Sequence, residues 1–247
     1  VERAGDVIPH VISVDKSKRG SNSKKYIFPE RCPSCGSKTT KDFNETTNKF
    51  DVVRRCLNED FKCEKIAMES LKHFVSKEAL NIDGFGKKIV EKFWELKLVK
   101  FPQDIFNLDF EKIKEFDGWG DLSVSNLKYA IEKSKKISLD KFIYSLGIRH
   151  IGQENAKLLA QHLKNFENFY KLLKTDNIEN LLNIDGIGET QIKSIRVFFS
   201  NKINLNILEK LNKSMKIFDA ISTKKGGILK NKAFMFTGKL KEISRAE

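Results

Sequence analysis

The chain has 247 residues, of which 40% are hydrophobic, 32% charged and 10% aromatic, a composition typical of soluble globular proteins rather than disordered ones. No apolar run approaches the roughly 20 residues that a membrane-spanning helix needs, so we expect no membrane partner. The formal net charge of +13 suits a polyanion such as nucleic acid, although AT-rich codon usage would produce a similar lysine surplus without any ligand.

The first 29 residues predict the end of a β domain and a linker. Residues 1 to 14 have the pattern of strand, bend and strand, in which apolar residues alternate from Val11 to Val14 and Pro9 limits pairing. Residues 16 to 25 are polar and predict a loop. Because 14 residues cannot form a sheet alone and no export signal follows Val1, we expect the chain to be a piece of a longer protein.

Residues 30 to 65 hold all the cysteines of the chain, namely Cys32, Cys35, Cys56 and Cys63. The sequence Cys-Pro-Ser-Cys-Gly that begins at Cys32 is typical of a metal knuckle, and the second pair is separated by six residues. We predict a structural Zn²⁺ with four sulfur ligands and no open position, hence no catalytic metal. Two disulfides, or unligated thiols, are the alternatives. His73 is expected to be an ordinary helix residue.

Residues 66 to 215 contain one pattern four times, in which an apolar residue is followed three and four positions later by a second apolar residue and a glycine. The copies are Ile82–Gly86, Phe116–Gly120, Ile148–Gly152 and Ile184–Gly188, and their last glycines are 34, 32 and 36 residues apart. The fourth and seventh positions after that glycine are apolar in every copy, which places them on one helix face. We therefore predict a mainly α fold built from four helix-hairpin-helix repeats.

The hairpins suggest a site for phosphate. Glycines let successive N–H groups point outward, and a helix N-terminus adds unpaired donors without reading any base. The candidate DNA-binding residues here are Gly84, Gly86, Lys87, Lys88, Gly118, Gly120, His150, Gly152, Gly186, Gly188, Lys193 and Arg196. The lysines and the arginine are equally well explained as solvated helix residues. His150 replaces a glycine in the third hairpin, so either the His150 side chain contacts phosphate or this hairpin is structural. In the second hairpin, Asp121 follows the turn and favours a packing role.

The last residues predict a linker and the start of another domain. Residues 214 to 225 are polar and lead into the Gly226-Gly227 pair, which is typical of a hinge, so we predict a linker at 216–228. Residues 229 to 247 are expected to start another domain. They include Ala233–Gly238, a pattern that predicts a buried strand and a glycine turn.

In this order, the features resemble the carboxy-terminal half of the bacterial NAD-dependent DNA ligases. The segments that carry the resemblance are Arg3–Pro9 at the end of an OB-fold domain, the Cys32-Pro-x-Cys35-Gly36 knuckle of a zinc finger, Ser70–Phe74 leading into the four-hairpin domain, and Phe236–Leu240 opening a BRCT domain. The gap from Cys35 to Cys56 is longer than we expect for this family. The resemblance implies domains at residues 1–29, 30–65, 66–215 and 229–247, with a linker at 216–228.

The resemblance also implies what the whole protein does. It would seal nicks in duplex DNA during replication and repair, using NAD and Mg²⁺ bound outside this chain, as a cytoplasmic, nucleoid-associated monomer. Arg3 would contact the backbone near the nick, while Val7 and Ile8 would press into the minor groove. The family's Lys-x-Asp-Gly motif is absent, since Asn81, Glu115 and Asn183 stand where its lysine would be. We therefore expect no catalytic residue here and no activity of this piece alone.

Two other functions fit the residues. A different repair or DNA-processing protein can carry the same hairpins without any preference for nicks. Alternatively, the hairpins only pack, and the chain is a scaffold for protein interactions.

Overall fold

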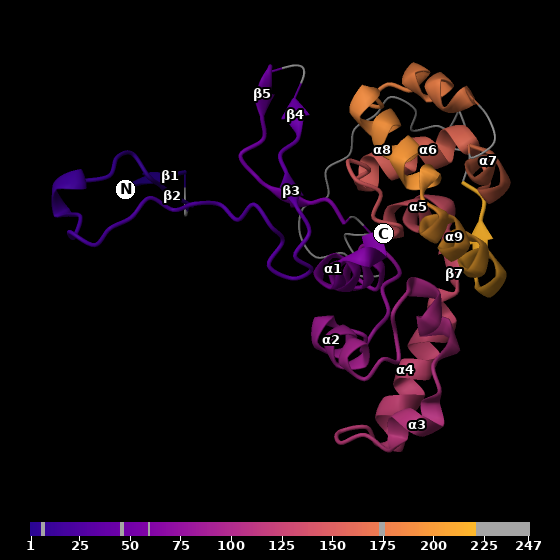
Figure 1. The fold of residues 1–247 in the computed structure, drawn as a ribbon. Helices are drawn as coiled ribbons and strands as arrows, with labels where there is room; N and C mark the ends of the chain where they lie inside the picture. The colour runs from indigo at the N-terminus through magenta and orange to yellow at the C-terminus, as the bar shows by residue number, and fades with distance from the viewer. Residues whose placement is uncertain (6–7, 45–46, 59, 173–175, 221–247) are drawn as a thin grey trace. The chain divides into compact units, whose positions relative to one another are not determined.

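A computed structural model of the chain describes residues 1–5, 8–44, 47–58, 60–172 and 176–220 (Figure 1). The chain divides into two compact units, Val1–Glu59 and Asp60–Glu247. Helices dominate the described residues and the strands are short, so the predicted mainly α class is confirmed. None of the helices described is long and apolar enough to cross a membrane.

The first unit begins with a short antiparallel pair, β1 (Glu2–Ala4) and β2 (Ile8–His10), in which Arg3 lies opposite Pro9. A 3-10 helix, η1 (Lys16–Lys18), follows and is capped by the side chain of Asp15. The alternating segment Val11–Val14 was predicted to be the second strand, but that strand lies earlier and ends at His10. Alternation alone cannot make a strand, because a strand also needs a partner for its N–H and C=O groups.

The rest of the first unit consists of two antiparallel strand pairs. The inner pair joins β3 (Thr39–Thr40) to β6 (Arg55–Cys56), and the outer pair joins β4 (Phe43–Asn44) to β5 (Lys49–Phe50). The Arg55 side chain lies 3.3 Å from a carboxylate oxygen of Asp42 and 3.5 Å from one of Asp51. The outer pair therefore occupies the long stretch between the second and third cysteines, and an ion-pair network holds its base together.

The second unit is helical. In chain order its described elements are η2 (Asp60–Lys62), α1 (Glu64–Phe74), α2 (Lys87–Glu95), η3 (Pro102–Asn107), α3 (Phe110–Lys114), α4 (Asp121–Ser134), β7 (Lys136–Ser138), α5 (Leu139–Ser145), α6 (Gln153–Leu163), α7 (Phe166–Lys171), η4 (Asp176–Asn183), α8 (Glu189–Ser200), α9 (Lys202–Ser214) and β8 (Lys216–Phe218). Each predicted repeat is a helix, a tight turn and a second helix, and the fourth repeat begins with the 3-10 helix η4.

The apolar positions of the repeats build the core of this unit. The side chains at the fourth and seventh positions after the last glycine of each hairpin, which were predicted to share one helix face, are all buried: Val90, Phe93, Val124, Leu127, Ala156, Leu159, Ile192 and Ile195. Burying a large apolar side chain contributes roughly 1.5–3 kcal/mol. The repeat thus folds as helix-hairpin-helix because each long helix has one apolar face and the turn directs that face inward.

Aromatic side chains at the turns join the first repeat to the second. The Phe93 ring lies 5.4 Å from the Phe85 ring and 5.4 Å from the Trp119 ring, measured between centroids. In the other half, a Cβ at Gly186 would lie 3.1 Å from Leu158 Cδ1, so the fourth hairpin packs closely on α6 of the third repeat. These contacts bring together the repeats as two successive pairs.

The segment after α9 does not begin as the predicted linker. Lys216–Phe218 forms β8, which pairs in parallel with β7, and the N–H of Lys216 donates to the carbonyl of Lys135 at 2.7 Å. The sequence analysis did not predict this strand, because the segment around it is mostly polar. In the strand itself only Ile217 is partly buried against the core. The predicted hinge at Gly226-Gly227 and the predicted domain at 229–247 lie outside the described residues.

Candidate nucleic-acid interface and metal centre

The four hairpins share one turn geometry. In each, the N–H of the second apolar residue donates to the carbonyl of the first at 3.0–3.1 Å. The third residue of each turn has a positive φ, which is the signature of a type II turn and favours glycine. These residues are Gly84 (78°), Gly118 (85°), His150 (61°) and Gly186 (93°). The sequence pattern therefore identified a repeated backbone conformation, including the copy in which histidine replaces glycine.

The helix after each hairpin begins at a glycine. Gly86, Gly120, Gly152 and Gly188 are the N-cap residues of α2, α4, α6 and α8. The first N–H groups of a helix have no partner within the helix and carry its positive dipole end. No side chain caps α2, α4 or α6 in the described structure. These three turns therefore present backbone donors at the surface.

Three other described helices have their N-termini closed by side chains, whereas α1 and α5, with Cys63 and Ser138 as N-cap residues, do not. Asp109 accepts hydrogen bonds at the start of α3, Asn165 does so at α7, and Asn201 at α9. The helices that follow the first three hairpins have a glycine where these helices have a capping side chain. A Cβ built on Gly86, Gly120 or Gly152 would meet nothing within 4 Å. The hairpins are thus open both to hydrogen bonding and to close approach by a large ligand.

The fourth hairpin differs, because the N–H of Gly188 donates to Oε1 of Gln191 at 3.1 Å. Nearby, the predicted DNA contact Arg196 donates to Glu179 at 2.5 Å. The sequence analysis missed Gln191 and Glu179. A signal for Gln191 was present, since a glutamine three residues after an N-cap often bonds back to it.

At the third hairpin, His150 occupies the left-handed position itself, and its carbonyl accepts from Nδ2 of Asn155 at 3.1 Å. Gly147 is a separate left-handed residue, and a Cβ there would lie 3.4 Å from the His73 ring. His73 Nε2 lies 2.8 Å from the carbonyl oxygen of Tyr144. His73 is therefore a packed helix residue that contacts the segment before the third hairpin.

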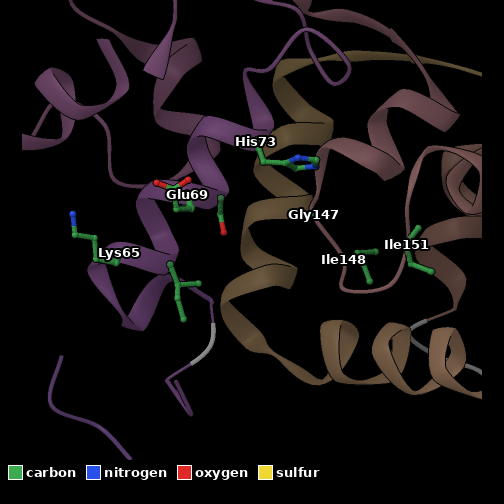
Figure 2. Close-up of a pocket in the computed structure, with 8 residues that line it drawn as sticks. Lys65, Glu69, His73, Gly147, Ile148 and Ile151 are labelled. Atoms are coloured by element: carbon green, nitrogen blue, oxygen red, sulfur yellow. The ribbon is translucent and has the colours of Figure 1, made fainter. Parts of the chain in front are cut away.

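A cavity of about 490 Å³ lies beside this hairpin, and its lining includes residues of α1 (Figure 2). Its lining residues are Lys65, Ile66, Glu69, Ser70, His73, Gly147, Ile148 and Ile151. Figure 2 shows His73 pointing across toward the loop at Gly147. The contact between His73 and Gly147 thus lies within the wall of this cavity.

Cations and acids are unevenly placed around the turns. Lys87, Lys88 and Lys193 are exposed on the helices that follow the first and fourth hairpins. At the second hairpin, Lys114 Nζ lies 3.5 Å from Asp121 and 3.1 Å from Glu111, and these carboxylates raise the pKa of Lys114. The first hairpin is thus followed by two adjacent exposed lysines, although Asp83 lies in its turn, and the third turn carries Arg149. Of the residues predicted near the nick, Arg3 and Ile8 lie in β1 and β2, Ile8 is exposed, and Val7 lies outside the described residues.

The four cysteines come together, and their sulfur atoms lie within 4.8 Å of one another. Sγ of Cys35 lies 3.4 Å from Sγ of Cys56. Zinc–sulfur bonds of about 2.3 Å in a tetrahedron separate the sulfurs by about 3.8 Å, so the donor set and its spacing fit Zn²⁺. Hydrogen bonds from Ser37 lower the pKa of Cys35 to about 6, and burial raises the pKa of Cys56 to about 12.

Known proteins resemble this chain along its whole length. The family model for the helix-hairpin-helix motif matches residues 141–208, which contain the third and fourth hairpins. Proteins named DNA ligase are 66% identical in Pelagibacter ubique (strain HTCC1062), 42% in Wolbachia pipientis subsp. Culex pipiens (strain wPip) and 42% in Neorickettsia sennetsu (strain ATCC VR-367 / Miyayama). Each comparison covers 100% of this chain but only 36% or 37% of the relative. The chain therefore corresponds over its full length to one part of proteins named DNA ligase, and this part contains a helix-hairpin-helix motif.

Proposed function

We propose that this chain is the part of an NAD-dependent DNA ligase that holds duplex DNA around a nick without reading its sequence. One observation carries the proposal: three of the four hairpins leave the N-terminal amides of the next helix uncapped beneath open space. Among the other described helices, α3, α7 and α9 close the same groups with Asp or Asn, and the hairpin helices differ from the uncapped α1 and α5 in beginning at a glycine. The net charge of +13 and the similarity to proteins named DNA ligase support a nucleic-acid ligand.

In this proposal each engaged hairpin holds one phosphate through backbone N–H groups. The absence of a side chain at Gly86, Gly120 and Gly152 lets the sugar-phosphate strand approach the backbone. Lys87 and Lys88 add charge at the first hairpin, and Lys193 and Arg196 add it at the fourth. Gly84, Gly118 and Gly186 hold the turns in shape, and His150 does so at the third.

The hairpins are not equivalent in this account. The first has an open turn and two exposed lysines, so we rank it as the strongest phosphate site. The second places the carboxylate of Asp121 at the start of its helix, which opposes a phosphate there. At the fourth, phosphate has to displace Gln191 from the Gly188 N–H. The two pairs of hairpins would then follow the minor groove across both strands.

We also propose that Cys32, Cys35, Cys56 and Cys63 hold a structural Zn²⁺. Four thiolates complete its tetrahedron, so the ion supplies folding free energy and no reactive position. The first unit has few buried residues and needs such support, since Val1, Val11, Tyr26, Phe50 and Val52 are among its exposed apolar side chains. A zinc finger at 30–65 would connect the β pieces at 1–29 with the hairpin domain at 66–215.

The remaining parts of the proposal concern the whole protein. Arg3 would contact the backbone beside the nick, and Val7 with Ile8 would press into the minor groove. The adenylation lysine, NAD and Mg²⁺ would belong to regions outside this chain, which contributes binding and no catalytic group. A linker within 216–228 would lead to a BRCT domain that begins at 229. The protein would act as a monomer in the cytoplasm, on the nucleoid.

Three alanine variants test the phosphate sites: Gly86→Ala, Gly120→Ala and Gly152→Ala. Each added Cβ enters open space at a negative φ, so the fold tolerates it, but it obstructs an approaching phosphate. We expect the affinity for a nicked duplex, measured by fluorescence anisotropy, to fall most for Gly86→Ala. Gly20→Ala is the matched control, because its Cβ also meets nothing within 4 Å and Gly20 lies far from any hairpin in the sequence. Unchanged binding by all three variants would favour the scaffold function.

A further inference from the structure

The end of α1 contacts the segments that lead into two different hairpins, the first and the third. These hairpins belong to different pairs of repeats, and the helix after each of them has no side-chain cap in the described structure. We propose that His73, near the end of α1, is a positioning residue that fixes the third hairpin relative to the first, so that one DNA duplex can meet both. This inference rests on the proposed function and assigns a role in DNA binding to a residue outside the hairpins.

Backbone hydrogen bonds join the end of α1 to the first hairpin. The N–H of Leu80 donates to the carbonyl of Phe74 at 3.2 Å. The N–H of Ile82, the first residue of the hairpin, donates to the carbonyl of Val75 at 3.3 Å. All four side chains are buried in the core of the helical unit. The last turn of α1 and the start of the first hairpin therefore form one packed piece.

His73 joins the same end of α1 to the third repeat. Its Nε2 lies 2.8 Å from the carbonyl oxygen of Tyr144, and the two rings lie 4.7 Å apart in an edge-to-face arrangement. Because a carbonyl oxygen only accepts hydrogen bonds, Nε2 carries the proton. The N–H of Gly147 donates to the same carbonyl at 3.1 Å, and Ile148, the first residue of the third hairpin, follows directly. The imidazole thus binds the oxygen that also shapes the start of this hairpin.

The surroundings of His73 make this contact important for the orientation of the third hairpin. The cavity of about 490 Å³ lies between the earlier part of α1, from Lys65 to Ser70, and Ile148 and Ile151 of the hairpin (Figure 2). The two segments do not pack solidly there, so the hydrogen bond and the ring contact of His73 fix the angle between them. Elsewhere in the unit α9 packs against η3, which joins the end of the hairpin domain to its first half. We therefore expect loss of the imidazole to loosen the third hairpin without unfolding the chain.

A fixed arrangement of two phosphate sites raises the affinity for a duplex that spans both. Once one hairpin holds a phosphate, the other binds within the same complex, and the gain over a single site is about 10²-fold to 10⁴-fold. A loosened third hairpin loses part of this gain, because its orientation then has to be fixed on binding. We expect His73→Met to weaken binding to a nicked duplex by about 10-fold. His73→Gln has nearly the same size and helix propensity but keeps an N–H donor, so it should recover most of the affinity.

The experiment is a double-mutant cycle in the full 247-residue chain, with affinity for a nicked duplex measured by fluorescence anisotropy. Gly152→Ala obstructs the third hairpin directly, so a residue that acts by orienting this hairpin should have little further effect in that background. We expect the loss caused by His73→Met to shrink from about 10-fold to less than about 2-fold there. A substitution that merely destabilises the fold would weaken binding equally in both backgrounds. Ser70→Ala is the matched control, because Ser70 lies on the same helix and lines the same cavity.

The outcomes separate this inference from the proposed function. If Gly86→Ala and Gly152→Ala bind the nicked duplex as well as Gly20→Ala does, the hairpins hold no phosphate, and the inference falls with the proposed function. If those two variants bind weakly but His73→Met binds as Ser70→Ala does, or loses the same factor in both backgrounds, the proposed function stands and the inference is overturned. A loss in His73→Met that disappears in the Gly152→Ala background and is recovered in His73→Gln supports the inference.

Discussion

Gly188 and Gln191 form a hydrogen bond that distinguishes the fourth hairpin from the other three, with the Gly188 N–H donating to Oε1 of Gln191 at 3.1 Å. A phosphate at this turn has to compete with the glutamine for the same donor. A protein hydrogen bond of this kind contributes about 0.5–1.5 kcal/mol. Of the two hairpins that the family model matches at residues 141–208, the fourth is thus partly closed by its own helix.

We predict that Gln191→Ala raises the affinity for nicked duplex by up to about 5-fold, because about 1 kcal/mol is no longer needed to displace the side chain. Thermal unfolding should show a loss of stability of similar size. The comparison is made by fluorescence anisotropy against Gln153→Ala, at the start of α6. An affinity that falls in Gln191→Ala would show that the glutamine assists binding instead of competing with it.

Two glycines of the first hairpin should respond in opposite ways to alanine. Gly84 has a φ of 78°, where a side chain costs roughly 1–2 kcal/mol, so Gly84→Ala should lower the free energy of unfolding by that amount. Gly86 has a φ of −73° and open space at its Cβ, so Gly86→Ala should leave stability nearly unchanged. Urea denaturation followed by circular dichroism measures both. Equal losses in the two variants would contradict the described turn.

Removal of the metal should affect the first unit and leave the helical unit folded. The buried cluster that stabilises the helical unit consists of residues from Leu71 to Met215 and includes none of residues 30–58. We therefore predict that a strong chelator makes the segment between Cys35 and Cys56 sensitive to protease while the helical circular dichroism signal persists. Mass spectrometry of the early fragments locates the cuts. Resistance of this segment after complete metal removal would contradict a structural role for zinc.

Lys72 joins α1 to α2 and should make stability depend on pH. Its Nζ lies 2.6 Å from Glu69 and 2.7 Å from Glu91, and the hydrogen bond from Lys72 lowers the pKa of Glu91. A lowered carboxyl pKa contributes stability above its ordinary value, and this is lost as the pH falls through the lowered value. We predict that Lys72→Met is less stable than wild type near neutral pH and that the difference shrinks in acid. Melting temperatures between about pH 3 and pH 7 test this; a constant difference would contradict it.

The sequence predicted the repeated parts of the fold because several independent positions agreed in each copy. Ile192 and Ile195 were placed on one helix face through the same spacing as Val90 and Phe93, and all four are buried. The left-handed residue of the third turn was less evident, since glycine elsewhere marks this conformation and His150 does not. Only the alignment with the other three copies identified its place.

Features that depend on partners distant in sequence were missed. The strand β8 forms because Lys135 accepts from Lys216, a contact between segments about 80 residues apart that local composition does not encode. The Arg196–Glu179 pair likewise depends on how η4 meets α8. The four cysteines were grouped by their spacing alone, and their sulfur atoms do lie together, but the 3.9 Å contact from Asn58 Nδ2 to Cys35 Sγ depends on the pairing of β3 with β6.

The most direct test of the central claim is the salt dependence of binding to a nicked duplex of unrelated sequences. Each phosphate neutralised by a lysine or arginine should contribute about −0.9 to the slope of log K against log salt concentration. Lys87, Lys88, Lys193 and Arg196 beside the turns therefore predict a slope of about −3 or steeper, the same for every sequence, whereas Gly86→Ala should weaken binding to every sequence and leave the slope nearly unchanged, because it removes no charge. A slope near zero, or an affinity that depends on sequence, would contradict the account that these turns bind the phosphate backbone.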